Sequence, residues 1–125
     1  MLETRGLSMH FGGVVAVDRV DFSLRENELR CLIGPNGAGK STFFKCLTAQ
    51  LRPTAGDVVI RDFNVTGSES HQVARMGVGI KTQVPNVFDG LDVEENIWLS
   101  ASQSTSVKRA RVITTEVIDR LKLGD

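Results

Sequence analysis

Apolar and polar residues alternate in two segments near the N-terminus. Residues 7–11 place Leu, Met and Phe on one face and Ser and His on the other, which is the period-two pattern of a half-buried strand. The alternation resumes at residues 20–24, after a valine-rich extended segment at 14–17. The glycine pair at 12–13 favours a tight turn between these segments, so we expect the two strands to pair antiparallel.

A nearly continuous apolar run at residues 29–33 predicts a strand that is buried on both faces and contains Cys31. Apolar residues then recur at helical spacing and predict a helix over about 40–50, which contains Cys46. The proline and glycine of the segment 52–56 stop this helix. Residues 57–61 predict another short strand.

The second half of the chain predicts three helices and one strand. Polar residues at 66–70 cap a short helix over 69–76, and residues 77–83 predict the strand. Asp92 caps a helix over 93–101, whose first turn is acidic. After a polar patch, a last amphipathic helix buries one face, which consists of Val107, Ala110, Thr114, Val117 and Leu121.

The link between the strand at 29–33 and the following helix carries a phosphate-binding pattern. Residues 34–42 match Gly-x-x-x-x-Gly-Lys-Ser/Thr without a mismatch. A loop that wraps a triphosphate needs backbone N–H groups that point inward, and its glycines permit the turns. The helix N-terminus adds further N–H groups. An ordinary glycine-rich turn is the alternative, but it leaves four fixed positions between a strand and a helix unexplained.

This pattern assigns the residues of the loop to a nucleotide. Lys40 would place its positive charge on the β and γ phosphates, and Ser41 would place its hydroxyl on a phosphate-bound Mg²⁺. The predicted contacts to the nucleotide in this loop are Gly34, Asn36, Gly37, Ala38, Gly39, Lys40, Ser41 and Thr42.

Composition narrows the class of protein further. The 125 residues are 41% hydrophobic and 24% charged, which is typical of a single globular domain. Fifteen basic and fifteen acidic residues cancel, so no basic field favours nucleic acid as a partner. No apolar run reaches the roughly 18 residues of a membrane span, and the first residues show no secretory signal. The two cysteines are typical of buried residues in a reducing cytosol.

Taken with the phosphate loop, several landmarks give the chain a resemblance to the nucleotide-binding domain of ABC transporters. Phe11 precedes two glycines, Arg-Pro-Thr-Ala-Gly-Asp occupies 52–57, Gln83 ends a strand, and Leu-Asp-Val-Glu-Glu-Asn occupies 91–96, in the order of that family. The resemblance implies an α/β fold with the P-loop NTPase core of ABC type, here partial, and an N-terminal antiparallel β subdomain. The domain would span residues 1–125, with the Walker A loop at 34–42 and the Q-loop around 83.

The same resemblance implies roles for single residues. Phe11 would stack on the adenine ring, although its alternation with Leu7 and Met9 is equally that of a core residue. Gln83 would contact Mg²⁺ and the attacking water, and so act in catalysis with Lys40. Without the resemblance Gln83 is only a polar strand end. Val87, Phe88 and Leu91 would form a surface for a membrane-embedded partner, or else cap the core.

Two departures from the family stand out. Ala49 occupies the position of a helix-ending glycine, which would cost about 1 kcal/mol if the residue needs a left-handed conformation. Family members are about twice as long, and their second half holds the Leu-Ser-Gly-Gly-Gln signature, the Walker B strand and the switch histidine. None of these motifs occurs in residues 1–125. The resemblance implies that the missing half also supplies sheet neighbours to the strand at 29–33.

The resemblance therefore implies the ATP-binding, energy-coupling subunit of an ABC transporter, most similar to importers of branched-chain amino acids or urea. ATP and Mg²⁺ would be its cofactors, and permease subunits and a second ATP-binding subunit its partners. It would lie in the cytoplasm at the inner face of the cell membrane. The complete subunit would be an ATPase, whereas residues 1–125 alone would bind ATP weakly or not at all and would not hydrolyse it. The rival interpretation is a non-catalytic nucleotide-binding or interaction module.

Overall fold

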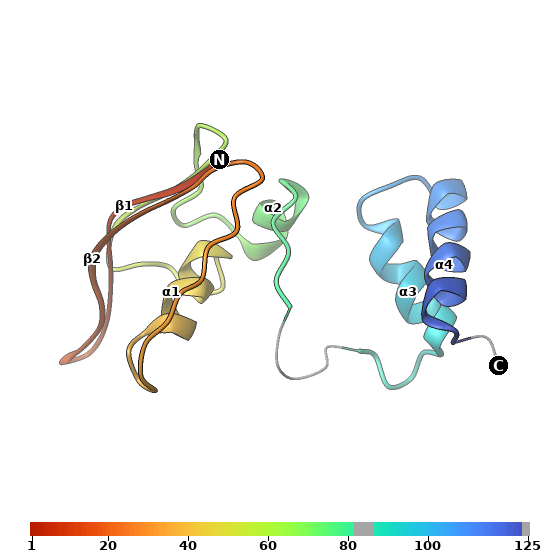
Figure 1. Ribbon diagram of the computed structural model, residues 1–125, viewed down its shortest axis with the longest axis horizontal. Coiled ribbons are helices and arrows are strands. Elements are labelled where there is room, and N and C mark those ends of the chain that lie inside the picture. The colour runs from red at the N-terminus through yellow and green to blue at the C-terminus, as the bar shows by residue number, and fades with distance from the viewer. Residues whose placement is uncertain (82–86, 124–125) are drawn as a thin grey trace. The chain divides into compact units, whose positions relative to one another are not determined.

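The structure is a computed structural model that describes residues 1–81 and 87–123. The chain forms two compact units, Met1–Ile80 and Lys81–Asp125. The first unit contains the sheet and the helices α1 and α2, and the second contains the helices α3 and α4 (Figure 1).

The sheet of the first unit has four antiparallel strands in the order β2-β1-β3-β4. Strand β1 spans Leu2–Phe11 and turns through the glycine pair into β2, which spans Val14–Leu24. Strand β3 (Ala55–Ile60) pairs with the other edge of β1, and the short β4 (Phe63–Asn64) completes the sheet. The predicted antiparallel hairpin and the strand near 57–61 are therefore confirmed.

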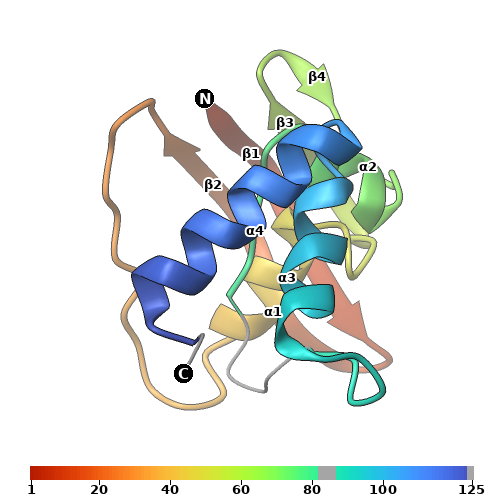
Figure 2. The same ribbon diagram turned by 90° about the vertical axis from the view of Figure 1, so that its right-hand side faces the viewer.

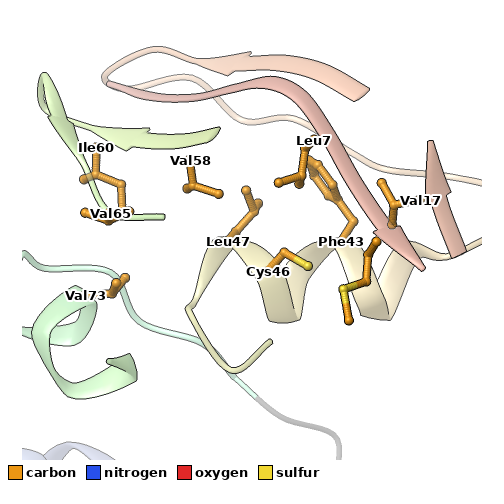
Figure 3. Close-up of a cluster of buried hydrophobic side chains, with 10 residues drawn as sticks. Leu7, Val17, Phe43, Cys46, Leu47, Val58, Ile60, Val65 and Val73 are labelled. Atoms are coloured by element: carbon orange, nitrogen blue, oxygen red, sulfur yellow. The ribbon is translucent and has the colours of Figure 1, made fainter. Parts of the chain in front are cut away.

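Helix α1 spans Lys40–Leu47 and packs its apolar side against one face of this sheet (Figure 3). Phe43 and Leu47 point toward Leu7 on β1, and Val58 on β3 extends the contact. Ten residues form this buried cluster, namely Leu7, Met9, Val17, Phe43, Cys46, Leu47, Val58, Ile60, Val65 and Val73. The core therefore lies between the sheet and α1, and it anchors the first residues after the phosphate loop.

The short helix α2 (Ser70–Arg75) contributes Val73 to this core, as predicted. Its N-cap is Glu69, which forms a capping box with Gln72. This box satisfies two backbone N–H groups at the start of the helix.

The predicted strand at residues 29–33 is wrong for this structure. These residues are not part of any strand, Leu29 is 98% exposed, and Cys31 is exposed instead of buried. A strand exists only where a neighbour accepts its hydrogen bonds, and no strand pairs with this segment among the residues that the structure describes. The apolar residues are present, but none of the four strands of the sheet pairs with this segment or buries it.

The prediction of a strand over 77–83 is also wrong for residues 77–81, which are irregular. The remainder of that segment, including Gln83, lies outside the described residues.

The second unit is a pair of helices that lie side by side (Figure 2). Helix α3 spans Val93–Ser102, and its N-cap Asp92 forms a capping box with Glu95, which confirms the predicted start. Helix α4 spans Val107–Leu121 and is capped by Ser106.

Only part of the face predicted for α4 is buried. Ala110 and Thr114 are fully buried and Val117 is partly so, but Val107 and Leu121 are exposed. Helix α4 has 15 residues and α3 has 10, so at 1.5 Å per residue α3 is too short to cover both ends of α4. The periodic pattern predicted the correct face but not how far along the helix a neighbour would cover it.

Candidate functional site

The phosphate loop, residues 34–39, leads directly into the first turn of α1. Gly37 and Gly39 have φ values of 82° and 81°, a backbone region that only glycine enters at low cost. Gly39 is also the N-cap of α1. A Cβ atom built on Gly39 would lie 2.0 Å from the carbonyl oxygen of Ala16 on β2, so the position requires glycine for space as well as for conformation.

Lys40 folds back over this loop. Its Nζ atom donates hydrogen bonds to the carbonyl oxygens of Gly34 and Pro35, at 2.7 and 2.6 Å. The backbone N–H of Ala38 donates to the carbonyl of Pro35 at 3.3 Å and tightens the turn. The ammonium group is thus held within the loop by neutral acceptors, which phosphate oxygens could replace with stronger, charge-assisted bonds.

The remaining predicted residues of the loop are available at its surface. Ser41 is exposed in the first turn of α1, Thr42 is half-buried, and Asn36 is exposed. The loop therefore combines a positive charge, a hydroxyl and the free N–H groups of a helix N-terminus. This combination is suited to bind a polyphosphate.

Phe11 ends strand β1 and is 47% exposed. Leu7 and Met9, on the same face of the strand, are buried in the core. The interpretation of Phe11 as a core residue is therefore wrong, and its ring is accessible to a ligand. Contact with a nucleotide base stays a prediction.

A hollow adjoins the phosphate loop between β2 and α1. Residues of the loop and of α1 form one side of it, including Gly39, Lys40 and Phe43, and Ala16 and Val17 of β2 form another. A second hollow lies near the C-terminal end of α1, lined by residues such as Cys46 and Arg52, and contains none of the predicted site residues.

Two ionisable side chains outside the site have shifted pKa values. Burial raises the pKa of the Cys46 thiol. The pKa of Glu28 is lowered, first by the hydrogen bond from the backbone N–H of Arg25 and then by the Arg30 side chain. Neither residue contacts the phosphate loop, so neither shift bears on nucleotide chemistry.

The reasoning from sequence missed Ala16 and Ser8. Ala16 faces Gly39 through a backbone carbonyl, which no side-chain pattern reveals. The period-two alternation places the polar Ser8 on the exposed face of its strand, yet it is buried.

Comparison with known proteins defines the class to which this site belongs. The model of the ABC transporter family matches residues 17–125. The ATP-binding protein LivG for high-affinity branched-chain amino acid transport in Salmonella typhimurium is 44% identical over 103 residues, which are 82% of this chain and 40% of LivG. The corresponding BraF of Pseudomonas aeruginosa is 39% identical over 100 residues, 80% of this chain and 39% of BraF.

Solved structures agree with this match. A nucleotide-free ATP-binding cassette from an ABC transporter superposes with a TM-score of 0.72 at 27% identity, covering 88% of this chain and 44% of that one. The fold is also that of a dimeric cassette bound to ADP and Pi, with a TM-score of 0.77 at 22% identity over 95% of this chain and 56% of that one.

The chain belongs to the ABC transporter family and has the P-loop NTPase fold of its cassettes. It spans about two fifths of the length of these relatives, 40% of LivG and 39% of BraF.

Proposed function

We propose that this chain binds ATP through residues 34–42 and forms part of the energy-coupling subunit of an ABC importer. The observation that carries the proposal is Lys40, whose ammonium is held over the glycine loop at the N-terminus of α1. On binding, the ammonium would exchange the carbonyls of Gly34 and Pro35 for the β and γ phosphates, while loop N–H groups bind the remaining oxygens.

Mg²⁺ would enter with the triphosphate. Among residues 1–81 and 87–123, no three His, Cys, Asp or Glu side chains gather as a metal site. The Ser41 hydroxyl, exposed in the first turn of α1, is suited to contact a phosphate-bound ion. Such an ion neutralises charge on the phosphates. Gln83 would contact the same ion and the attacking water, and Phe11 would stack on the base.

The relatives suggest the transport process that this site serves. LivG and BraF are named for branched-chain amino acid transport, so we infer an importer of such solutes or of a similar small solute, with urea as a further candidate. The subunit would work with transmembrane permease subunits and a second ATP-binding subunit. Within the described residues no helix combines the length and apolar character that crossing a bilayer requires. The proposed location is the cytoplasmic face of the cell membrane, through the permease.

The test is a titration of the protein as its gene encodes it, with a fluorescent ATP analogue and Mg²⁺. We expect Lys40→Ala to weaken binding at least about tenfold, because a hydrogen bond to a charged group contributes ~1.5–3 kcal/mol. Lys45→Ala is the matched control, since Lys45 is an exposed lysine in the same helix and should leave the affinity unchanged. Equal affinity in the Lys40→Ala variant and the wild type would contradict the proposal.

A further inference from the structure

Strands β1 and β2 pair irregularly at three places on the way to the candidate site. Between Thr4 and Leu7, two residues of β1 lie opposite one residue of β2. Between Leu7 and Met9, one residue of β1 lies opposite two residues of β2. A third irregularity leaves Ala16 on β2 without a partner between Val17 and Val15. Such bulges bend a strand and change the direction of its side chains, and they often occur beside functional sites.

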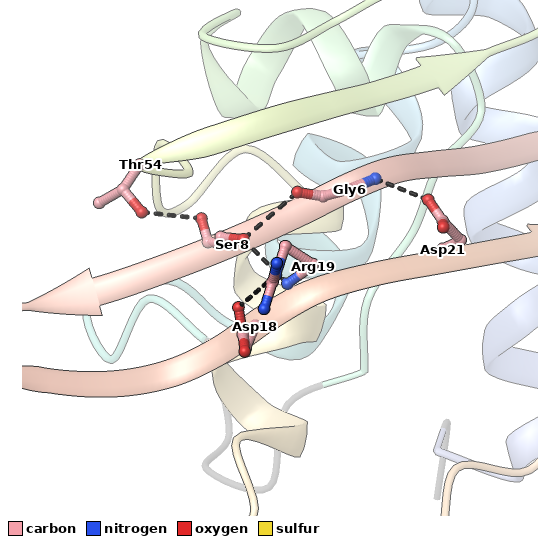
Figure 4. A network of polar contacts seen from close by, with 6 residues as sticks. All are labelled: Gly6, Ser8, Asp18, Arg19, Asp21 and Thr54. Atoms are coloured by element: carbon pink, nitrogen blue, oxygen red, sulfur yellow. Dashed lines mark hydrogen bonds and ion pairs between the residues drawn. The ribbon is translucent and has the colours of Figure 1, made fainter.

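A network of polar contacts fills the first two irregularities, and Ser8 lies at its centre (Figure 4). The Ser8 hydroxyl accepts a hydrogen bond of 2.9 Å from the backbone N–H of Arg19 and donates one of 3.3 Å to the carbonyl of Gly6. Arg19 has a φ of 44°, so this residue holds a strained conformation. The first bulge is closed by Asp21, whose carboxylate accepts from the N–H of Gly6 at 2.6 Å.

Ser8 also joins the hairpin to the next strand. Its carbonyl accepts hydrogen bonds from the N–H and the hydroxyl of Thr54, at 2.9 and 3.0 Å, just before β3 begins. The Ser8 residue is only 4% exposed. One buried residue therefore ties together β1, the bulge of β2 and the entry into β3.

The two strands lead from this network to different parts of the site. Strand β1 ends at Phe11, three residues after Ser8. Strand β2 carries Ala16, whose carbonyl oxygen abuts Gly39 of the phosphate loop. The register between the strands therefore determines where Phe11 lies relative to the loop. A slip by one residue would move a strand by about 3.3 Å and reverse the face of its side chains.

We propose that Ser8 is a positioning residue that keeps Phe11 at the distance from the phosphate loop that a nucleoside triphosphate requires. This inference rests on the proposed function. Without the hydroxyl, the N–H of Arg19 loses its acceptor and the bulge can relax to another register. The loop is held by Lys40 and α1, so its affinity for phosphates alone is preserved while the base contact is weakened.

The experiment compares two ligands that share the phosphate chain and differ in the base. Calorimetric affinities for MgATP and for magnesium tripolyphosphate are measured for the protein as its gene encodes it. In Ser8→Ala we expect the affinity for ATP to fall about threefold to tenfold. This loss corresponds to part of the binding free energy that base–aromatic stacking contributes. The affinity for tripolyphosphate should change less than about twofold, since that ligand does not reach Phe11.

Thr4→Val is the matched control. The Thr4 hydroxyl donates to the carbonyl of Val20 at 2.9 Å, is likewise buried and joins the same two strands, but at the end of the hairpin away from Phe11. This variant should lower thermal stability without changing the ratio of the two affinities. A selective loss of ATP binding in Thr4→Val would show that Ser8 has no special role.

Other outcomes also decide the matter. An equal loss for both ligands in Ser8→Ala, or no loss, would overturn the inference without contradicting the proposed function. If Ser8→Ala does not fold, Ser8→Cys replaces it, because a thiol is only a weak hydrogen-bond acceptor for the N–H of Arg19. That variant must then show the selective loss. A wild-type protein that binds neither ligand would refute the proposed function itself, and this inference with it.

Discussion

Ala49 adopts a left-handed backbone conformation just beyond the end of α1, with a φ of 54°. Its N–H donates to the carbonyl of Cys46 at 3.1 Å, and its carbonyl accepts from the hydroxyl of Ser70 at 2.9 Å. These bonds hold the residue in a conformation that costs an L-amino acid roughly 1–2 kcal/mol. Position 49, where the family has a glycine, therefore does require a left-handed backbone conformation.

We predict that Ala49→Gly stabilises the protein by about 1 kcal/mol, since glycine enters this region without a Cβ clash. Urea unfolding measures the change. Ala74→Gly is the control, because Ala74 is an exposed alanine within α2. There the same substitution should cost about 0.5–1 kcal/mol. Destabilisation by both substitutions would mean that the Ala49 methyl group contributes more through packing than its backbone conformation costs.

At the scale of elements, the segment before α3 is held by one side chain. Asn96 accepts from the N–H of Phe88 at 2.8 Å and donates to the carbonyls of Phe88, Leu91 and Asp92 at 3.1, 3.0 and 2.9 Å. These bonds order residues 88–92 while the apolar side chains of Val87 and Phe88 stay exposed. Phe88 is 62% exposed, so the alternative in which this side chain caps the core is wrong for this structure.

An ordered apolar surface suits a partner. We predict that Phe88→Glu weakens association with the proposed permease subunits about tenfold or more, as loss of a central aromatic contact can. Co-purification of the variant with the permease measures this. Phe63→Glu changes an equally exposed ring on β4, in the other unit, and should have no effect. Undiminished association of a folded Phe88→Glu variant would count against the surface.

For the whole molecule, the decisive question is turnover. Hydrolysis requires a positioned water and stabilisation of the charge on the transferring phosphoryl group as well as binding. Residues 1–125 carry Lys40, Ser41 and Gln83 but neither the family signature nor the Walker B glutamate. Removing one preorganised electrostatic donor can already cost about 10²–10³ in rate.

We therefore predict that a polypeptide of residues 1–125 releases no phosphate from ATP above background. A coupled phosphate assay with and without Mg²⁺ tests this, and Lys40→Ala provides the baseline. Steady release that Lys40→Ala abolishes would mean that these residues complete a catalytic site by themselves. A protein that binds ATP but shows no turnover even as its gene encodes it would favour the non-catalytic module.

Features with local causes can be predicted from the sequence alone. The alternation of apolar and polar residues, with the glycine pair, predicted the β1–β2 hairpin. Asp92 predicted the start of α3. Both features form through contacts between residues that are close in the sequence. The spacing of glycines and Lys40 likewise predicted the phosphate loop, since backbone conformation at Gly37 and Gly39 is a property of the residue itself.

Whether a pattern is buried or paired depends on which element packs against it in the folded chain. The apolar run at 29–33 was predicted as a buried strand and is exposed, because burial and strand pairing depend on another element alongside it. The alternation of β1 assigned Phe11 to the core and Ser8 to the surface, and both assignments are reversed. Bulges shift register through contacts between distant residues, such as Ser8 with Arg19, so a period-two pattern within one strand cannot reveal them.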